Sequence, residues 1–225
     1  MTRPNRSYTS PLREDQARLT RRRVLDAAHE LFLAHGYTGT TIDAVAGHAG
    51  VSVQTVYNAV GNKAALLAAV YDTVLAGDDA PVPIAQRPTF QAMLAETDGR
   101  RCLARYAALG RELGERAVPL VAVILAGSAD PAVRALADTA ENQRAIGTAT
   151  VARHCAERFG LRPGLSVDDA ADILWTLTAP EVTIRLVLRR RWSWDHYQTW
   201  LADTMADSVL GPPPPRSRRR PKTHG

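Results

Sequence analysis

The sequence has little cysteine and no long hydrophobic segment, and each shortage excludes a class of protein. Two cysteines among 225 residues cannot form a disulfide framework and are typical of thiols in a reducing compartment. The longest apolar run, residues 117–126, is interrupted by Pro119 and is shorter than the roughly 18 residues that cross a bilayer. The N-terminus is polar and basic, which predicts no secretory signal. We therefore expect a cytoplasmic protein without a membrane partner.

Motifs of catalysis and of metal or cofactor binding are also missing. The six histidines show no spacing typical of a metal site, and His154 and Cys155 are neighbours whose side chains diverge on a helix. There is no GxSxG motif, no phosphate-binding glycine loop and no carboxylate pair that suggests acid–base chemistry. We expect no enzymatic activity, no catalytic residue, no metal and no cofactor.

Positive charge is carried by arginine and lies at the two ends of the chain. Lys63 and Lys222 are the only lysines among 28 basic residues. Residues 1–23 carry a net charge of +5 and residues 211–225 carry another +5, so the middle of the chain has a net charge of −5. Basic ends on a slightly acidic body favour contact with a polyanion such as nucleic acid. Two solvated tails are the alternative.

The hydrophobic pattern has the period of an α-helix, and no alternating run of β-branched residues predicts a strand. Residues 24–35 place apolar side chains at i, i+4, i+7 and i+8, and Gly36 is a natural stop. Residues 40–43 fit a capping box closed by an aspartate. Pro119 and Pro180 should kink or split their helices. Further helices are expected at roughly 63–74, 89–96, 100–128, 131–160, 168–190 and 194–210.

Residues 40–60 predict a helix-turn-helix, the strongest functional indication in the sequence. Two short helices flank a turn at Gly50, where glycine supplies the required backbone freedom. Ala46, Val51 and Val56 are spaced to pack the two helices against each other. The pattern thus predicts a small DNA-binding module.

The second of these helices leaves polar side chains outside the core. Gln54 and Asn58 can hydrogen-bond adenine in the major groove, and Thr55 offers a hydroxyl or a methyl group. Tyr57 can reach a phosphate. Stability alone does not require such a set on so short a helix, so we expect these residues to face DNA.

The run from Thr20 to Leu67 resembles the DNA-binding domain of TetR-family (tetracycline-repressor-type) regulators. It reads T-R-R-R-V-L-D-A-A-x-E-L-F-x-x-x-G-Y-x-x-T-T-x-x-x-V-A-x-x-A-G-V-S-x-x-T-V-Y-x-x-x-x-x-K-x-x-L-L, about 48 residues in register. The family commonly has Y-x-H-F at the end of the second helix, whereas residues 57–60 are Tyr-Asn-Ala-Val. Residues 168–210, with W-T-L-T-A-P-E-V, resemble the C-terminal regulatory domain of actinobacterial-type members.

The pattern and the resemblance together predict an all-α fold, with an N-terminal three-helix helix-turn-helix domain joined to a larger C-terminal helical bundle. The resemblance implies a homodimer that binds double-stranded DNA at a palindromic operator and is released, as a repressor, by an unknown small-molecule ligand. The expected parts are a flexible basic arm over 1–18, the helix-turn-helix domain over 19–67, a ligand-binding and dimerisation domain over 68–210, and a disordered Pro/Arg tail over 211–225.

Ten residues in the N-terminal domain are expected to contact DNA. The arginines begin the first helix, where they oppose its dipole, so an external anion explains them better than a charged face does. Lys63 begins the fourth helix, where its ammonium and the free N–H groups can face a phosphate. The expected contacts are Arg21, Arg22, Thr40, Thr41, Ser52, Gln54, Thr55, Tyr57, Asn58 and Lys63.

The C-terminal region has aromatic and aliphatic residues at helical spacing, which suit either a core or an interface. A ligand pocket is expected at Cys102, Tyr106 and Trp175. The expected dimer interface consists of Leu174, Leu177, Ile184, Leu188, Trp200, Leu201, Met205 and Val209.

Other functions stay open at this point. The chain could be an architectural protein that binds DNA without sequence preference, or a regulator that activates transcription or lacks a ligand. A catalytic C-terminal domain with the helix-turn-helix as an adaptor is a further alternative, although the sequence supplies no nucleophile for it.

Overall fold

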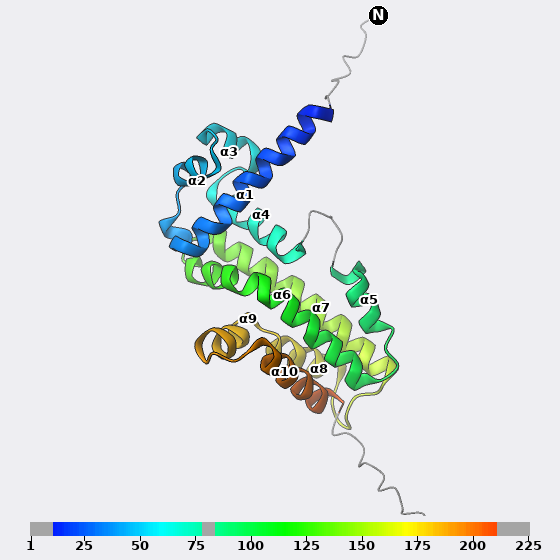
Figure 1. The fold of residues 1–225 in the computed structure, drawn as a ribbon. Helices are drawn as coiled ribbons and strands as arrows, with labels where there is room; N and C mark the ends of the chain where they lie inside the picture. Colours follow the sequence, from blue (N-terminus) through cyan, green and yellow to red (C-terminus); the bar gives the residue numbers. More distant parts are fainter. Residues whose placement is uncertain (1–10, 78–83, 211–225) are drawn as a thin grey trace, which may run out of the picture. The chain divides into compact units, whose positions relative to one another are not determined.

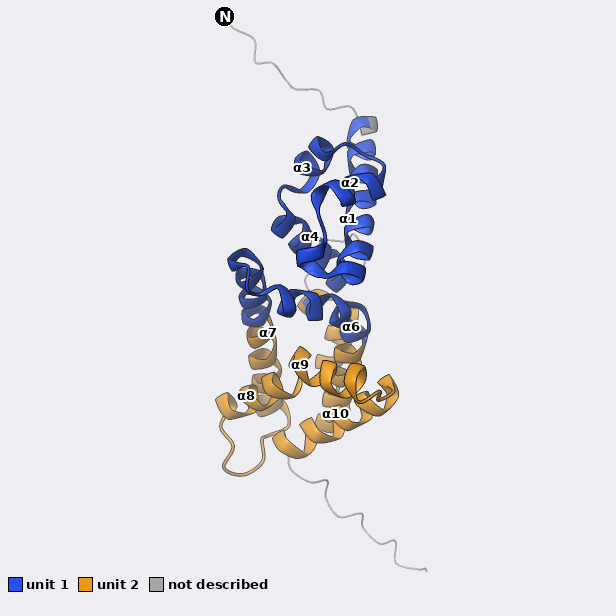
Figure 2. Cartoon of the chain, turned by 90° about the vertical axis from the view of Figure 1, so that its left-hand side faces the viewer, with its two compact units in different colours: residues 1–84, 112–143 blue, residues 85–111, 144–225 orange. Residues whose placement is uncertain are grey.

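The computed structural model describes residues 11–77 and 84–210, and every regular element in these two stretches is helical (Figure 1). The expected all-α class is therefore confirmed. No helix in the described stretches is both long and apolar enough to cross a bilayer. The expected tail, 211–225, lies outside the described residues. The chain forms two compact units (Figure 2): unit 1 contains residues 1–84 and 112–143, and unit 2 contains residues 85–111 and 144–225.

Four helices of unit 1 pack around one apolar core. They are α1 (Pro11–Gly39), α2 (Ile42–Ala49), α3 (Val53–Val60) and α4 (Lys63–Ala76). Val24 and Phe32 of α1, Val45 of α2, Val56 of α3 and Leu66 of α4 are fully buried in this core. Helix α1 contacts each of the other three, so the long first helix holds the short ones in place.

The turn between α2 and α3 has the backbone geometry that the sequence predicts. Gly50 lies in the left-handed region, with φ of 65°, and ends α2 by donating its N–H to the carbonyls of Ala46 and Gly47. A residue with a Cβ would be strained there. The N–H of Val51 also donates to Ala46. The helix-turn-helix geometry is thus present in the described chain.

Two local expectations about the first helices are wrong. Helix α1 begins at Pro11, a favourable first position for proline, so residues 11–18 are helical rather than part of an arm. The N-cap of α2 is Thr41, and the third residue of the helix is therefore Ala44. Asp43 is in the second position, so it does not form a capping box. The expected break at Gly36 is observed, since its φ of 69° interrupts α1.

Two long helices, α6 (Gly99–Gly127) and α7 (Pro131–Arg158), each contribute residues to both units (Figure 2). Leu120, Ile124 and Val133 from these helices belong to the core of unit 1. A kink or a split was expected at Pro119, and the split does not occur, because α6 continues through it as one element. Pro119 itself is exposed, and buried side chains at 118 and 120 hold the helix on either side.

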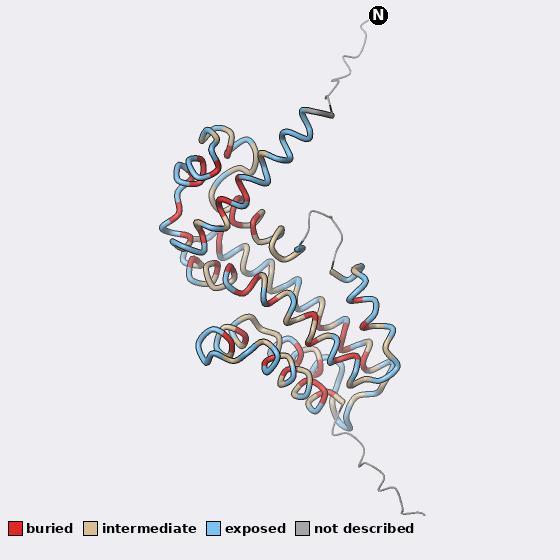
Figure 3. Tube along the Cα trace, viewed as in Figure 1, coloured by how far each residue is buried: buried red, intermediate tan, exposed pale blue. Residues whose placement is uncertain are grey.

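Besides parts of α6 and α7, unit 2 contains several shorter helices. They are α5 (Pro88–Leu94), α8 (Val167–Leu177), α9 (Pro180–Thr183), the π-helical segment η2 (Ile184–Arg189) and α10 (Trp194–Val209), preceded by the 3₁₀ turn η1 (Ile84–Gln86). Pro180 separates α8 from α9, which confirms the expected split. Helix α8 packs against α10, and buried positions recur along both at the helical period (Figure 3).

Candidate functional site

Helix α3 presents a polar face to solvent because a buried residue anchors its opposite face. Val56 is fully buried, and the half-buried Val53 and Val60 pack against the same core. On the other face Gln54 and Asn58 are exposed, and Tyr57 exposes 48% of its surface. An amphipathic helix of eight residues has one face for packing and one for a partner. The placement of these polar residues agrees with the sequence, while their contact with DNA stays a prediction.

The N-termini of α2 and α3 carry hydroxyl caps. Thr41 Oγ1 accepts a hydrogen bond of 3.1 Å from the N–H of Ala44, and Ser52 Oγ accepts one of 3.1 Å from the N–H of Thr55. The hydroxyls of Ser52 and Thr55 also lie 2.8 Å apart in a shared hydrogen bond. Thr41 and Ser52 are exposed at helix ends where uncapped N–H groups and the helix dipole favour an anion.

Two amide side chains on the exposed face of α3 are joined to each other. Gln54 Nε2 donates to Asn58 Oδ1 at 2.9 Å, one helical turn apart. The bond leaves Gln54 with its amide oxygen and one N–H, and leaves Asn58 with both hydrogens of Nδ2 and one lone pair of Oδ1. The two amides therefore differ in the donors and acceptors that remain free, although the sequence predicts the same contact with adenine for both.

Three basic residues hold the C-terminal ends of α1, α2 and α3. Arg21 Nη1 donates to the carbonyl of Ala59 at 2.7 Å, near the end of α3, and Arg23 donates to the carbonyl of Ala49 at the end of α2. Lys63 Nζ donates to two carbonyls at the end of α1, those of residues 37 and 40, at 3.0 and 3.1 Å. Cations at helix C-termini satisfy free carbonyls and complement the helix dipole.

This arrangement gives Lys63 and Arg21 roles inside the domain, while their expected contacts with DNA stay predictions. Both were expected at phosphates, whereas two donors of Lys63 and one of Arg21 are used within the domain. Lys63 also lies 4.3 Å from the centre of the Tyr37 ring. Arg22 is exposed on α1, so its expected contact with DNA is untested. The cation–carbonyl pairs join residues 23 to 38 positions apart, and no local sequence pattern indicates them.

Thr40 is not available to DNA, which corrects an expected contact. It is 1% exposed, and its hydroxyl donates to the carbonyls of Gly36 and Leu31 at 2.8 and 3.1 Å. The side chain closes the end of α1 instead of facing outward. Thr41 caps α2 and Thr40 does not, and the sequence alone did not indicate which of the two threonines is the cap.

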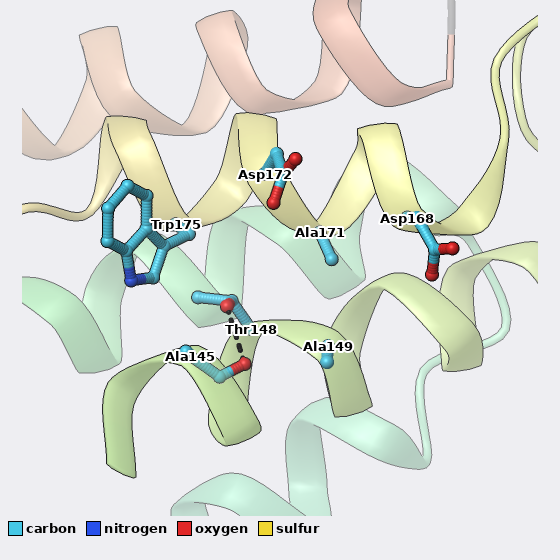
Figure 4. A pocket seen from close by; sticks show the side chains of 7 residues that line it. All are labelled: Ala145, Thr148, Ala149, Asp168, Ala171, Asp172 and Trp175. Carbon is cyan, nitrogen blue, oxygen red and sulfur yellow. Dashed lines mark hydrogen bonds between the residues drawn. The ribbon is translucent and has the colours of Figure 1, made fainter. Parts of the chain in front are cut away.

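Unit 2 contains a hollow of about 360 Å³ between α7 and α8 (Figure 4). Its lining consists of small residues, two aspartates and one aromatic ring: Ala145, Thr148, Ala149, Asp168, Ala171, Asp172 and Trp175. Arg144 lies 4.9 Å from the centre of the Trp175 ring and donates to its carbonyl and, at 3.2 Å, to Thr178 Oγ1. Of the three expected pocket residues, Trp175 alone lines this hollow.

The other two expected pocket residues lie elsewhere in unit 2. Cys102 is fully buried beside Cys155, and the hydrogen bond between the two thiols, together with burial, raises the pKa of Cys155. Burial also raises the pKa of Tyr106 to about 12, although Arg144 and a hydrogen bond with Thr178 act in the opposite direction. These groups belong to the packed interior and do not line the hollow.

Half of the expected dimer interface is inside the core of unit 2. Leu174, Leu201, Met205 and Val209 have exposed fractions of 0% within a single chain, so they cannot supply a surface for a second copy. The stripe of apolar residues on α10 packs against α8 instead. Leu177, Ile184, Leu188 and Trp200 keep part of their surface exposed.

No group of three or more His, Cys, Asp or Glu side chains within residues 11–77 and 84–210 is placed to hold a metal ion.

Comparison with known proteins identifies the N-terminal domain. Residues 24–70 match the family model described as bacterial regulatory proteins, tetR family. The matched segment runs from α1 to α4 and includes every element that positions the exposed face of α3. A sequence search among curated proteins gives no match.

Solved structures share the fold across most of the chain. NalD from Pseudomonas aeruginosa, described as the secondary repressor of the MexAB-OprM multidrug efflux pump, is similar with a TM-score of 0.62 and 21% identity, over 86% of this chain and 98% of that chain. A protein from Saccharomonospora viridis, described as a transcriptional regulator in complex with choline, has a TM-score of 0.65 and 21% identity over 84% and 97%. The SmeT–triclosan complex has a TM-score of 0.66 and 19% identity over 87% and 98%.

At these identities the structural neighbours establish a common fold, and the family model establishes what the N-terminal domain is. That family is described as bacterial regulatory proteins. With its helix-turn-helix formed and the polar face of α3 exposed, the segment of residues 24–70 is the N-terminal DNA-binding domain of the tetR family of bacterial regulatory proteins.

Proposed function

We propose that the protein is a homodimeric, sequence-specific repressor that leaves a palindromic operator when a small molecule binds to unit 2. The observation that carries the DNA-binding part is the polar face of α3, where Gln54, Tyr57 and Asn58 are exposed opposite a buried Val56. In helix-turn-helix proteins this second helix enters the major groove and its side chains contact base edges. The adjoining hydroxyls of Thr41 and Ser52 are then suited to the phosphate backbone.

A dimer is required because one short helix contacts too few base pairs for a useful affinity. Two copies related by a two-fold axis place their α3 helices in successive major grooves, about 34 Å apart, so the preferred DNA should be palindromic. We place the second copy against the partly exposed Leu177, Ile184, Leu188 and Trp200. Leu188 exposes 40% of its surface, a large fraction for an aliphatic residue.

Release by a small molecule is supported by the hollow between α7 and α8. It is large enough for a compact organic molecule and has one aromatic wall, Trp175, and two carboxylates, Asp168 and Asp172. The S. viridis relative is described as a choline complex and SmeT as a triclosan complex, so two proteins of this fold have small organic ligands. A ligand displaces DNA only if it binds the two states of the protein with unequal affinity.

Selection of bound fragments from random double-stranded DNA tests this proposal. Purified full-length protein should enrich a palindrome whose half-sites lie about one helical turn apart, and light scattering should give the mass of a dimer. Enrichment without any sequence preference would instead support the architectural alternative, in which the basic ends of the chain bind DNA through phosphates alone. A monomer that selects a single half-site would contradict the dimeric part.

A further inference from the structure

The two amides on α3 are the feature from which more can be inferred about the bound sequence. Both Gln54 and Asn58 are exposed, and either could hydrogen-bond adenine if it were alone. They are not independent, because Gln54 Nε2 donates to Asn58 Oδ1 at 2.9 Å. What each can offer to a base edge therefore depends on the other.

Counting the remaining donors and acceptors separates their roles. Gln54 keeps its Oε1 acceptor and one Nε2 hydrogen, which match the N6 amino donor and N7 acceptor of adenine. Asn58 keeps both donors of Nδ2 and the second lone pair of Oδ1, but the bond to Gln54 directs this oxygen along α3. A paired contact with adenine would need Oδ1 and Nδ2 of Asn58 to face the same base edge, so it competes with the bond to Gln54.

The position of the pair on the helix supports this division. Gln54 is in the first turn of α3, the part of such a helix that reaches base edges, and Asn58 lies one turn later. A free glutamine amide can rotate about its last side-chain bond and exchange its oxygen with its nitrogen. The bond to Asn58 selects the orientation in which the Gln54 nitrogen faces along α3.

We propose that Gln54 selects an adenine in each operator half-site and that Asn58 is a positioning residue that fixes the Gln54 amide. The proposal rests on the proposed function, since it assumes that α3 enters the major groove. It differs from the expectation that both amides contact adenine. Each half-site should then have one adenine that depends on both residues.

The test compares variants on the selected operator and on its three single-base replacements at the adenine position. The unmodified protein should prefer adenine by about tenfold or more. Gln54→Glu loses the donor to N7 and can only accept, so the preference should move to cytosine, which presents an amino donor. Asn58→Ala removes no adenine contact, yet it should reduce the adenine preference severalfold because the Gln54 amide is released.

A conservative variant separates positioning from a contact made by Asn58 itself. Asn58→Asp keeps an acceptor for Gln54 Nε2, so the adenine preference should be retained while affinity falls on every sequence, because the new carboxylate faces phosphates. Tyr57→Phe is the control, since it should weaken all four sequences about equally. Thermal unfolding should be nearly unchanged in all four variants, whose altered side chains are exposed.

The outcomes distinguish this inference from the proposed function. If the unmodified protein enriches no palindrome, the proposed function fails. If it enriches a palindrome but Gln54→Glu leaves the base preference unchanged, the adenine contact is wrong. If Asn58→Ala alters the preference at a different base pair, or if Asn58→Asp loses the adenine preference as Asn58→Ala does, then Asn58 contacts DNA directly and is not a positioning residue.

Discussion

Replacing Lys63 by methionine should destabilise the DNA-binding domain and leave the salt dependence of DNA binding unchanged. The substitution keeps the apolar stem and removes an ammonium that donates to the carbonyls of Tyr37 and Thr40 at 3.0 and 3.1 Å. Both of these residues are buried, with exposed fractions of 8% and 1%, so water is poorly placed to replace the lost donors. The ammonium also lies 4.3 Å from the centre of the Tyr37 ring.

The expected size of the effect follows from these three contacts. A hydrogen bond to a charged group contributes about 1.5–3 kcal/mol, and a cation–π contact at a partly exposed site about 0.5–1 kcal/mol. Since Lys63 is itself half-buried and its carbonyl partners are partly rehydrated on unfolding, we expect Lys63→Met to cost about 2–4 kcal/mol. For a chain of this length that corresponds to a decrease in Tm of about 5–15 °C.

Two measurements decide between this role and a phosphate contact. Thermal unfolding gives the stability, and operator affinity at several salt concentrations gives the slope of log K against log salt. Removing a lysine that binds phosphate would lower the magnitude of that slope by about 0.9 for each bound subunit and leave Tm almost unchanged. Arg18→Met is the stability control, because Arg18 is exposed and pairs with the nearby Asp15 at 2.8 Å, so its removal should cost little stability. An unchanged Tm with a reduced slope for Lys63→Met would refute the structural role.

Three further predictions follow from the same structure. Arg21→Met should weaken binding to all DNA sequences without changing the salt slope, because Arg21 holds the carbonyl of Ala59 at the end of α3; a reduced slope in the salt titration would show that it binds phosphate instead. Leu201→Asp should unfold unit 2, since a carboxylate would replace a fully buried side chain, whereas Leu188→Asp should give a folded monomer. Circular dichroism measures folding and light scattering measures mass, and a folded monomer from Leu201→Asp would place Leu201 in the dimer interface after all. Tyr106→Phe should reduce the loss of stability in alkali. Burial raises the pKa of Tyr106 to about 12 in the folded state, against about 10 in the unfolded state, so the unfolded state binds fewer protons between these values and stability falls as pH rises. Urea titrations at several pH values measure this fall, and an equal fall for both proteins would contradict the prediction.

The elements predicted best from the sequence are those whose signals are local. The two short helices, the turn at Gly50 and the outward face of α3 all depend on residues within about 20 positions of one another. Apolar period, cap chemistry and the left-handed glycine act over one or two helical turns, and they agree with each other here. The break at Pro180 belongs to the same class, because proline acts on its own helix.

Two local predictions failed where neighbouring residues alone do not decide the structure. Thr40 and Thr41 are both plausible caps, and the packing of α1 against α2 decides that Thr40 turns inward while Thr41 caps. Pro119 lies within a helix that the flanking buried residues keep continuous, so tertiary burial outweighs the local cost of proline there.

By itself, then, the sequence determined the helical class, the helix-turn-helix and the set of polar side chains that α3 exposes, because each rests on contacts between near neighbours in the chain. The tertiary structure alone decided which partners those side chains and the basic residues take. A stripe of apolar residues such as Leu201 and Met205 has the same period whether it packs against its own chain or against a second copy. An arginine or lysine likewise has the same charge whether a phosphate or a helix C-terminus binds it, and the choice at Arg21, Arg23 and Lys63 depends on which carbonyls the fold brings within reach.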